Sequence, residues 1–538
     1  MLTCGELLVE MLEGFGVDTV FGIPGVHTVE LYRGLPATQI THITPRHEQG
    51  AGFMADGYAR VSGKPGVCFI ITGPGMTNIT TAMGQAYADS IPMLVISSVN
   101  NTEQLAMGGG RLHELPSQSN LVAGVAAFSH TLMRADELPA VLSRAFAVFN
   151  SARPRPVHIE IPINVITAPA DHVKRKLGAV PSRPAPCPDA ILRAVDMLKS
   201  AKRPLVLLGG GTTHACAEAV RLVEALDAPT AYTINAKGVL PKGHPLALGS
   251  NQSLVPVREL VLQADVVLAI GTELGETDYD AVFDGNFQIE SQLIRVDIDA
   301  EQLNRNYPAD IAILSDSRLA IKALLAGLGE VPAFNPQGPG SKLAAQVREQ
   351  LDAQVPEAWR AQKRVLDVLQ ETLPEMIFAG DSTQIVYSGN HLFEANQPRT
   401  WFNSSTGYGT LGYGLPAAIG AKLSAPERPV VALIGDGGIQ FTLPELASAV
   451  EANAPVIVLL WNNSGYGEIK RYMQNRDIPT IGVDIYTPDF LTLAKGFGCN
   501  AERAESFEQL RELLLSAAKA DRPTIIEIQE HAEFLSAV

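Results

Sequence analysis

The sequence predicts an α/β fold of doubly wound parallel sheets, covered by helices on both faces. Short runs of Val, Ile and Leu, such as those at 66–72, 93–97 and 457–461, alternate with longer segments of helical period. Strands buried on both faces of a parallel sheet have this uninterrupted apolar pattern, because crossover helices lie on either side. The second observation is length. Single cores stop growing near about 250–300 residues, so 538 residues predict about three domains.

Two proline-rich stretches, 168–189 and 327–341, interrupt the alternation of strands and helices. Proline removes a backbone donor and stiffens the chain, so such stretches favour linkers over packed elements. We therefore place the domain boundaries there. The predicted domains are residues 1–167, 190–326 and 342–538.

The first and last thirds of the chain contain matching strand-like runs. Runs that begin at residues 66, 92 and 156 are matched by runs that begin at 429, 455 and 523. The spacing between partners is almost constant, which indicates an internal repeat. We expect the first and third domains to share one topology and the central domain to differ.

Composition excludes several classes of partner. The chain has 41 Lys and Arg against 57 Asp and Glu, a formal charge of −16, so phosphate backbones and anionic lipid repel it. No apolar run approaches the roughly 18 residues that span a bilayer, and no basic stretch precedes an apolar one at the start. The five cysteines are scattered and lack a CxxC pair, which is typical of reduced thiols. We expect a cytoplasmic protein that binds neither nucleic acid nor membranes.

Polar residues follow two neighbouring strands of the last third. The sequence GDGG at 435–438 follows one apolar run, and the next run ends in Asn462 and Asn463. The carboxyl ends of parallel strands share one edge of a sheet, so Asp436 and Asn463 can converge. Carboxylate and amide oxygens suit Mg²⁺, which takes its remaining ligands from water and a bound phosphate. A simple turn would explain either motif alone, but the pair at this spacing favours a magnesium and phosphate site.

In these motifs the chain resembles thiamine-diphosphate-dependent enzymes, whose diphosphate-binding signature is similar to GDG followed by NN. Further segments are similar to the acetolactate synthase-like branch of that family, and the resemblance covers nearly the whole chain. It implies a pyrimidine-binding domain, a central Rossmann-like domain and a diphosphate-binding domain. The segments are VFGIPG (20–25), RHEQGAGFMADGYAR (46–60), TGPGMTN (72–78), RPVHIEIP (155–162) and GYGTLGYGLPAAIGAK (407–422).

The resemblance implies a role for individual residues. Glu48 corresponds to the glutamate that hydrogen-bonds N1′ of the aminopyrimidine and promotes the imino tautomer, which deprotonates thiazolium C2. Leu411 corresponds to the apolar residue that bends the cofactor, and the Gly409 carbonyl to the acceptor of its 4′-amino group. Without the family, Glu48 would more often be a solvated charge and Leu411 a core residue. The implied cofactor contacts are Pro24, Gly25, Glu48, Gly409, Leu411, Gly435, Asp436, Gly437, Gly438 and Asn463. The implied Mg²⁺ ligands are Asp436, Asn463 and the carbonyl of Gly465.

The resemblance also implies a homo-oligomer whose active sites lie at a dimer interface. Glu48 and Asp436 would then serve one cofactor from different subunits, and a monomer would be inactive. Acetolactate synthases bind FAD partly through the central domain. The glycines at 209–211 do not form GxGxxG, so we do not expect FAD here.

The chain departs from acetolactate synthases around the substrate. His113 and Glu114 replace a phenylalanine–glutamine pair, and Glu468 replaces a methionine. Asp381 and Ser382 stand where the pattern is apolar and small. Buried carboxylates are costly without partners, so either these acids find donors inside the protein or the substrate brings a cation.

A guanidinium presents paired donors that match a carboxylate. Among family members, decarboxylases of 5-guanidino-2-oxopentanoate, the oxo acid of arginine, are the most similar, and the hypothesis is its conversion to 4-guanidinobutanal and CO₂. In the alternative, Asp381 or Glu468 caps a helix or pairs with Lys470 or Arg471. Other readings are a carboligase that joins 2-oxo acids and a catalytically inactive scaffold.

Histidines supply candidates for proton transfer. His27 and His113 could relay the proton to the enamine, because imidazole titrates near working pH. In the alternative, each is a packed, hydrogen-bonded histidine. We expect His47, beside Glu48, to be structural.

Overall fold

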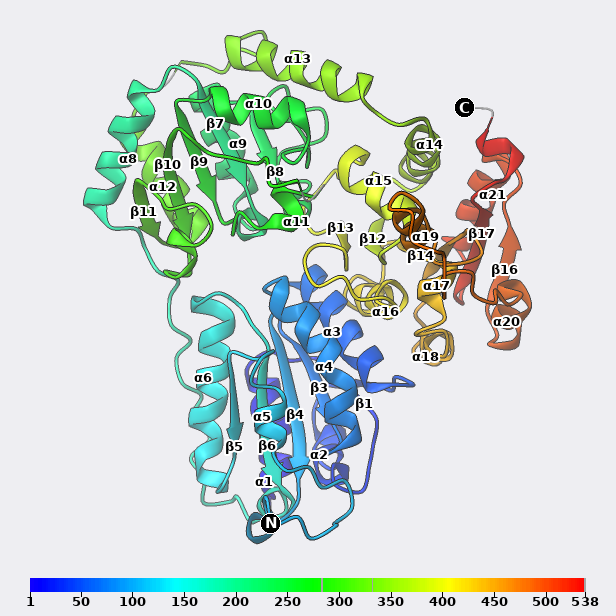
Figure 1. Ribbon diagram of the computed structural model, residues 1–538. Helices are drawn as coiled ribbons and strands as arrows, with labels where there is room; N and C mark the ends of the chain where they lie inside the picture. The colour runs from blue at the N-terminus through cyan, green and yellow to red at the C-terminus, as the bar shows by residue number, and fades with distance from the viewer. Residues whose placement is uncertain (282–283, 331, 537–538) are drawn as a thin grey trace. The chain divides into compact units, whose positions relative to one another are not determined.

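The computed structural model describes residues 1–281, 284–330 and 332–536. It contains three parallel sheets with helices between their strands (Figure 1). The chain forms two compact units. One contains Met1–Pro181, Met376–Gln384 and Asn403–Phe534, and the other contains Ser182–Glu375 and Ile385–Phe402. The first and third sheets therefore belong to one unit and the second sheet to the other.

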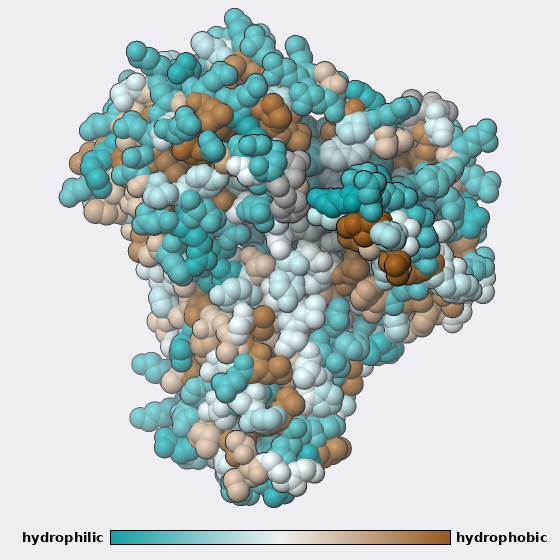
Figure 2. Space-filling model, viewed as in Figure 1, coloured by the Kyte–Doolittle hydropathy of each residue, from teal (hydrophilic) through white to brown (hydrophobic). Residues whose placement is uncertain are grey.

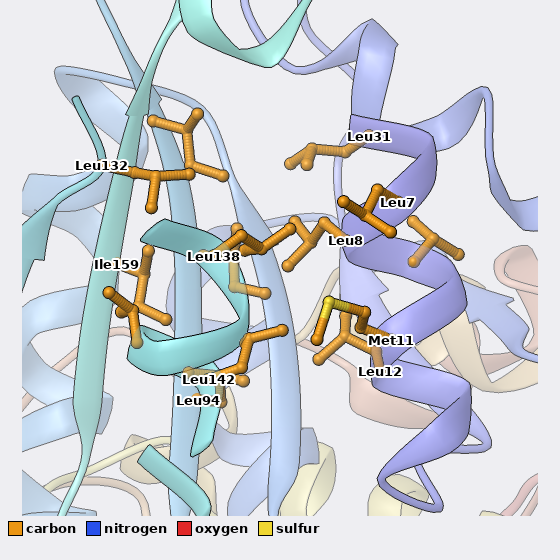
Figure 3. Close-up of a cluster of buried hydrophobic side chains, with 14 of the residues drawn as sticks. Leu7, Leu8, Met11, Leu12, Leu31, Leu94, Leu132, Leu138, Leu142 and Ile159 are labelled. Carbon is orange, nitrogen blue, oxygen red and sulfur yellow. The ribbon is translucent and has the colours of Figure 1, made fainter. Parts of the chain in front are cut away.

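The first sheet has the strand order β2-β1-β3-β4-β6-β5. Its strands are β1 (Thr19–Gly22), β2 (Thr41–Ile43), β3 (Gly66–Ile70), β4 (Met93–Val99), β5 (Phe128–Thr131) and β6 (Val157–Pro162). Helices α1 (Cys4–Gly14) and α6 (Leu138–Ser151) pack their leucines against β4 and β6 in one apolar cluster (Figure 3). A capping box of Thr3 and Glu6 fixes the start of α1.

Two further helices of the first domain connect its sheet to the third domain. They are α3 (Glu48–Ser62) and α4 (Pro74–Ala88), and α3 packs against α4, β1 and β3. Most of α3 is buried, because it also packs against α16 (Gly414–Ser424) of the third domain. A Cβ at Gly57 would lie 2.0 Å from the carbonyl oxygen of Ala417, so glycine permits this close approach.

The third sheet repeats the topology of the first. Its order is β13-β12-β14-β15-β17-β16, and in both sheets the strands run second, first, third, fourth, sixth, fifth. This confirms the predicted repeat. The strands are β12 (Ile377–Gly380), β13 (Trp401–Asn403), β14 (Val430–Gly435), β15 (Ile457–Asn462), β16 (Asn500–Arg503) and β17 (Thr524–Gln529). The helices after β14 are α17 (Asp436–Ile439), α18 (Glu445–Glu451), α19 (Gly467–Gln474), α20 (Phe490–Gly496) and α21 (Phe507–Ala517).

The central sheet has a different order, β11-β10-β9-β7-β8. Its strands are β7 (Pro204–Leu208), β8 (Thr230–Tyr232), β9 (Val266–Ile270), β10 (Gln292–Asp297) and β11 (Ile311–Leu314). Helices α8 (Pro188–Ser200), α9 (Cys216–Leu226) and α12 (Ser317–Leu328) share one apolar cluster with the sheet. Helices α10 (Val255–Gln263) and α13 (Pro339–Ala353) share another. Two separate clusters are what a doubly wound sheet requires, and the predicted fold class is confirmed.

The remaining helices are α14 (Glu357–Thr372), α15 (Gln384–Leu392) and the short α2 (Val29–Tyr32), α5 (Gln118–Leu121), α7 (Ile163–Ile166) and α11 (Glu276–Tyr279). Within residues 1–281, 284–330 and 332–536, no helix combines the length and apolar character needed to cross a membrane. The boundaries at 168–189 and 327–341 stay predictions.

Candidate active site

The structure brings the GDGG turn and the end of β15 together. Asp436 is only 1% exposed. Its Oδ1 accepts the backbone N–H of Asn463 at 3.1 Å, and its Oδ2 accepts the N–H of Gly465 at 2.9 Å. Two loops that are distant in sequence are therefore joined at one edge of the sheet by a single carboxylate.

Two more oxygens belong to the loop whose N–H groups this carboxylate accepts. Asn463 Oδ1 is buried and has no hydrogen-bond partner among the described residues. The carbonyl of Gly465 faces Gly437, since a Cβ at Gly437 would lie 3.6 Å from that oxygen. A carboxylate, an amide oxygen and a carbonyl are hard ligands, and the unpartnered amide oxygen is the type of atom that a cation satisfies. The residues present fit Mg²⁺.

Burial also sets the electrostatics of this turn. Loss of water around the carboxylate raises the pKa of Asp436, although the N–H groups of Asn463 and Gly465 oppose that rise. A divalent cation would favour the ionised form. A bound cation would therefore stabilise the ionised carboxylate of Asp436 at this site.

Glu48 lies at the first position of α3 and is 9% exposed. Its Oε2 accepts a hydrogen bond from Asn78 Nδ2 at 2.9 Å. A Cβ at Gly75 would lie 3.3 Å from Oε1, so this glycine leaves space beside the carboxyl group. His47 caps the helix, because its Nδ1 accepts the N–H of Gln49 at 3.1 Å. That contact gives His47 a structural role.

His27 and His113 face each other in the first domain, with ring centroids 5.3 Å apart. The Nδ1 atoms of both are buried and have no hydrogen-bond partner among the described residues. Burial and the neighbouring His113 lower the pKa of His27, which favours its neutral ring. His113 has a φ of 59° and lies against the turn at Gly73, where a Cβ would approach its carbonyl oxygen to 2.5 Å.

The segment between β13 and α16 presents Gly409 and Leu411. Gly409 is exposed with a φ of 77°, which favours glycine, and its N–H donates to the carbonyl of Ser404 at 2.9 Å. Leu411 is half-buried. At the end of this segment the Tyr413 hydroxyl donates to Asp56 of α3 at 2.5 Å.

Asp381 has donors inside the protein. It is fully buried, and its carboxylate accepts the N–H of Ser382 at 2.8 Å and of Gly414, at the start of α16, at 3.2 Å. Burial raises its pKa to about 6. Ser382 Oγ lies 3.2 Å from Ser404 Oγ. These contacts correspond to the helix-capping alternative.

The other two acids are more exposed. Glu114 accepts the N–H groups of Gly109 at 3.2 Å and Arg111 at 2.9 Å, and these contacts lower its pKa. The Glu468 side chain is 52% exposed and accepts from Gln384 Nε2 at 2.5 Å and from Arg471 at 3.1 Å. The pair with Arg471 corresponds to the ion-pair alternative for Glu468.

Sequence reasoning missed Gln118, which fixes the turn after β3. Its Oε1 accepts the Thr72 hydroxyl at 2.8 Å and the Gly73 N–H at 3.0 Å. Its Nε2 donates to Ser97 Oγ and to Glu160 Oε2. Gln118 is 3% exposed. No motif marks this residue, because a single glutamine in a polar stretch carries no sequence signal.

Comparison with known proteins gives three family matches in chain order. They are the N-terminal thiamine pyrophosphate (TPP) binding domain at residues 2–121, the central domain of thiamine pyrophosphate enzymes at 191–324 and the C-terminal TPP binding domain at 381–528. Among curated proteins, the chain is 45% identical to a probable 2-ketoarginine decarboxylase of Pseudomonas aeruginosa, over 98% of this chain and 94% of that protein. It is 31% identical to the large subunit of acetolactate synthase isozyme 1 of Escherichia coli, over 99% and 94% of the two chains. It is also 31% identical to a probable acetolactate synthase large subunit of Methanocaldococcus jannaschii, over 97% and 91%.

Proposed function

The chain belongs to the thiamine pyrophosphate enzyme family and is a thiamine-diphosphate-dependent 2-oxo acid decarboxylase, and we propose that it converts 5-guanidino-2-oxopentanoate to 4-guanidinobutanal and CO₂. The observation that carries the substrate assignment is the Glu468 carboxylate, whose side chain is 52% exposed on α19, so that a substrate guanidinium can take the place of Arg471. The Pseudomonas relative, named for the same substrate, supports it.

We assign the cofactor residues from the fit described above. Asp436, Asn463 and the carbonyl of Gly465 would hold Mg²⁺, and the metal would hold the diphosphate. When bound, thiamine diphosphate supplies the nucleophilic carbon and the electron sink for decarboxylation. Glu48 would hold a proton at the pyrimidine N1′. Pro24, Gly25 and the glycines at 435, 437 and 438 would line the cofactor.

The helix geometry supports a site shared between two subunits. Gly420 of α16 lies against Met54 of α3, and Gly57 lies against Ala417, so the two helices run antiparallel. The start of α16 therefore lies near the end of α3, about 18 Å along the helix axis from Glu48 at 1.5 Å per residue. Gly409 and Leu411 lie just ahead of α16, whereas the roles proposed for Glu48 and Gly409 require them to contact the same small pyrimidine ring.

One chain therefore holds the two pyrimidine contacts at opposite ends of a helix pair, which favours a homodimer that exchanges them. The surface beside Glu468 supports this assembly. Helix α19 has no buried residue, and apolar side chains are exposed on it and after it, as the brown atoms in that region of Figure 2 show. The exposed aliphatic side chains are Ile469, Ile478 and Ile481, and the ring of Tyr472 is exposed on the same helix as Ile469. A second copy that covers them would bury apolar area.

His27 and His113 are proposed as the groups that move the product proton. Their unpartnered Nδ1 atoms and the lowered pKa of His27 support a neutral ring that can accept and donate a proton. Asp381 and Ser382 are bonded within the third domain and Glu114 to its own loop, whereas the Glu468 pair with Arg471 is exposed to solvent and can exchange partners, so the specificity proposal concentrates on Glu468. A cytoplasmic location stays a proposal, consistent with five free cysteines. FAD is not expected.

Steady-state kinetics test the substrate. We expect the wild-type enzyme with thiamine diphosphate and Mg²⁺ to prefer 5-guanidino-2-oxopentanoate to pyruvate. E468Q should lower kcat/KM for the guanidino acid by about 10- to 100-fold, since a charged hydrogen bond contributes about 1.5–3 kcal/mol, and should spare pyruvate. E502Q, at an exposed acid on β16, is the matched control. Preference for pyruvate, unchanged in E468Q, would remove the guanidinium assignment.

The relatives named acetolactate synthases favour a second candidate, a carboligase that joins two 2-oxo acids. Product analysis with pyruvate alone separates the two reactions. Acetolactate would identify the carboligase, and acetaldehyde or no product would support the decarboxylase. A wild-type protein that releases no CO₂ from any 2-oxo acid would identify an inactive homologue.

A further inference from the structure

A buried carboxylate of the third domain holds the backbone just ahead of Glu48. Glu445, the first residue of α18, is 1% exposed. Its Oε1 accepts the N–H groups of Arg46 and His47, both at 3.1 Å, and its Oε2 accepts the Ser448 hydroxyl at 2.6 Å. These two N–H groups lie directly before the first turn of α3. The carboxylate therefore fixes the direction in which that helix begins.

The chain leaves room for this carboxylate. A Cβ at Gly50 would lie 2.1 Å from Glu445 Oε1, so glycine is required while Glu445 keeps its position. At the other end of α18, Glu451 holds the guanidinium of Arg46 at 2.5 Å, but that pair is exposed. Helix α18 thus contacts Arg46 twice, and only the contact through Glu445 is buried.

A corresponding contact runs in the opposite direction, from the first domain to the third. Gln85 of α4 is fully buried, and its Oε1 accepts the Thr410 hydroxyl at 3.1 Å and, more weakly, the Thr410 N–H at 3.4 Å. Thr410 stands between Gly409 and Leu411. The third domain therefore supplies a buried acceptor to the segment just before Glu48. The first domain supplies one to the segment that carries Gly409 and Leu411.

We propose that Glu445 and Gln85 are reciprocal positioning residues, of which Glu445 sets the orientation of Glu48 and Gln85 sets that of Gly409 and Leu411. The inference rests on the roles proposed for those three residues. Neither Glu445 nor Gln85 reacts. Each replaces water around a backbone N–H that would otherwise lose its partner on burial.

Hydrogen exchange of the cofactor-free protein, followed by mass spectrometry, tests Glu445 without relying on activity. In E445A, exchange at residues 46–52 should rise by about 10-fold, the equivalent of one lost hydrogen bond. E445Q should keep most of the protection, because its amide oxygen still accepts both N–H groups and its nitrogen can donate to Ser448. E451A is the matched control on the same helix and should leave exchange unchanged, since exposed ion pairs contribute little.

Turnover adds a readout that separates positioning from proton transfer. In the holoenzyme, kcat should fall about 10-fold or more in E445A and recover in E445Q, whereas a proton-transferring group would lose activity in both variants. G50A should resemble E445A, and adding G50A to E445A should cost less than G50A alone costs the wild type. This cycle keeps the proposal testable if E445A folds poorly.

Hydrogen exchange also tests Gln85, at a different segment of the chain. Q85A should raise exchange at residues 404–412 and leave residues 46–52 protected, the reverse of E445A. Exchange that is unchanged in E445A, or equally raised in E451A, would overturn the proposal. Failure of the proposed reaction would appear differently, as a wild-type protein that releases no CO₂ while the exchange pattern holds.

Discussion

The first and third domains share one strand order, yet they hold the turn after the third strand in opposite ways. In the first domain a neutral amide, Gln118, accepts the Gly73 N–H and ties the turn to the core. In the third domain the turn itself carries a carboxylate, Asp436, which accepts N–H groups from the neighbouring loop. Topology fixes where ligands bind, and the charge at the turn decides which part of a ligand binds there.

The largest effects are expected from two single variants, one in the third domain and one in the first. D436A should weaken Mg²⁺-dependent binding of thiamine diphosphate by about 10²-fold or more, because a metal ligand and the anchor of the 463–465 loop are lost together. E48Q should keep that affinity within a few fold but lower kcat by about 10²–10⁴-fold, the usual contribution of a proton-transferring group. Calorimetry of binding and steady-state kinetics measure the two effects.

Mixing the two inactive variants sharpens the contrast between the domains. If Glu48 and Asp436 serve one cofactor from different subunits, a mixed dimer regains one intact site. Random reassociation should then restore about a quarter of the wild-type activity. A mixture of E48Q with itself after the same unfolding and reassociation is the control. Recovery that never exceeds this control would show that each chain builds its own site.

The next effect concerns the neutral turn of the first domain. Q118L should lower the free energy of unfolding by about 2–4 kcal/mol, because the Thr72 hydroxyl, the Gly73 N–H and the Glu160 carboxyl group lose a buried partner. Urea unfolding followed by circular dichroism measures it. N120A, at an exposed position of the same short helix, should change stability by less than about 0.5 kcal/mol. Equal losses in both variants would contradict the assignment of Gln118.

The repeat and the convergence of the GDGG turn with the loop of Asn463 could be predicted from sequence because both depend on local patterns. Continuous apolar runs recur at matching positions, and GDGG lies one helix away from Asn462 and Asn463, so the shared edge of the sheet follows from topology alone. The unpartnered oxygen of Asn463 and the carboxylate of Asp436 lie where that argument expects them.

Contacts made through the backbone could not be predicted. Asp381 finds its donors at Ser382 and Gly414, and the backbone N–H of any residue type could provide them, so the sequence leaves no trace of the pairing. Glu445 contacts Arg46 and His47 across almost 400 positions. A long-range acceptor for a backbone donor has no composition or spacing to identify it.

The smallest effect is a pH dependence that distinguishes a fully buried acid of the third domain from a partly exposed one of the first. Burial raises the pKa of Asp381 from 3.8 to about 6, so the folded protein binds a proton in this range that the unfolded chain does not. Its ionised form therefore costs stability above pH 6, and the cost fades as the pH falls towards 4. The wild type should gain up to about 2 kcal/mol relative to D381N between pH 7 and pH 4, since one pKa unit corresponds to 1.36 kcal/mol.

E114Q is the matched comparison. Backbone N–H groups, that of Arg111 first, lower the pKa of Glu114, so its stabilising contribution is lost as the pH falls, and the wild type should lose stability relative to E114Q on acidification. Opposite slopes in the two pairs, measured by thermal unfolding across pH 4–7, follow from burial at Asp381 and from backbone hydrogen bonds at Glu114, and parallel slopes would mean that Asp381 is ionised at no cost.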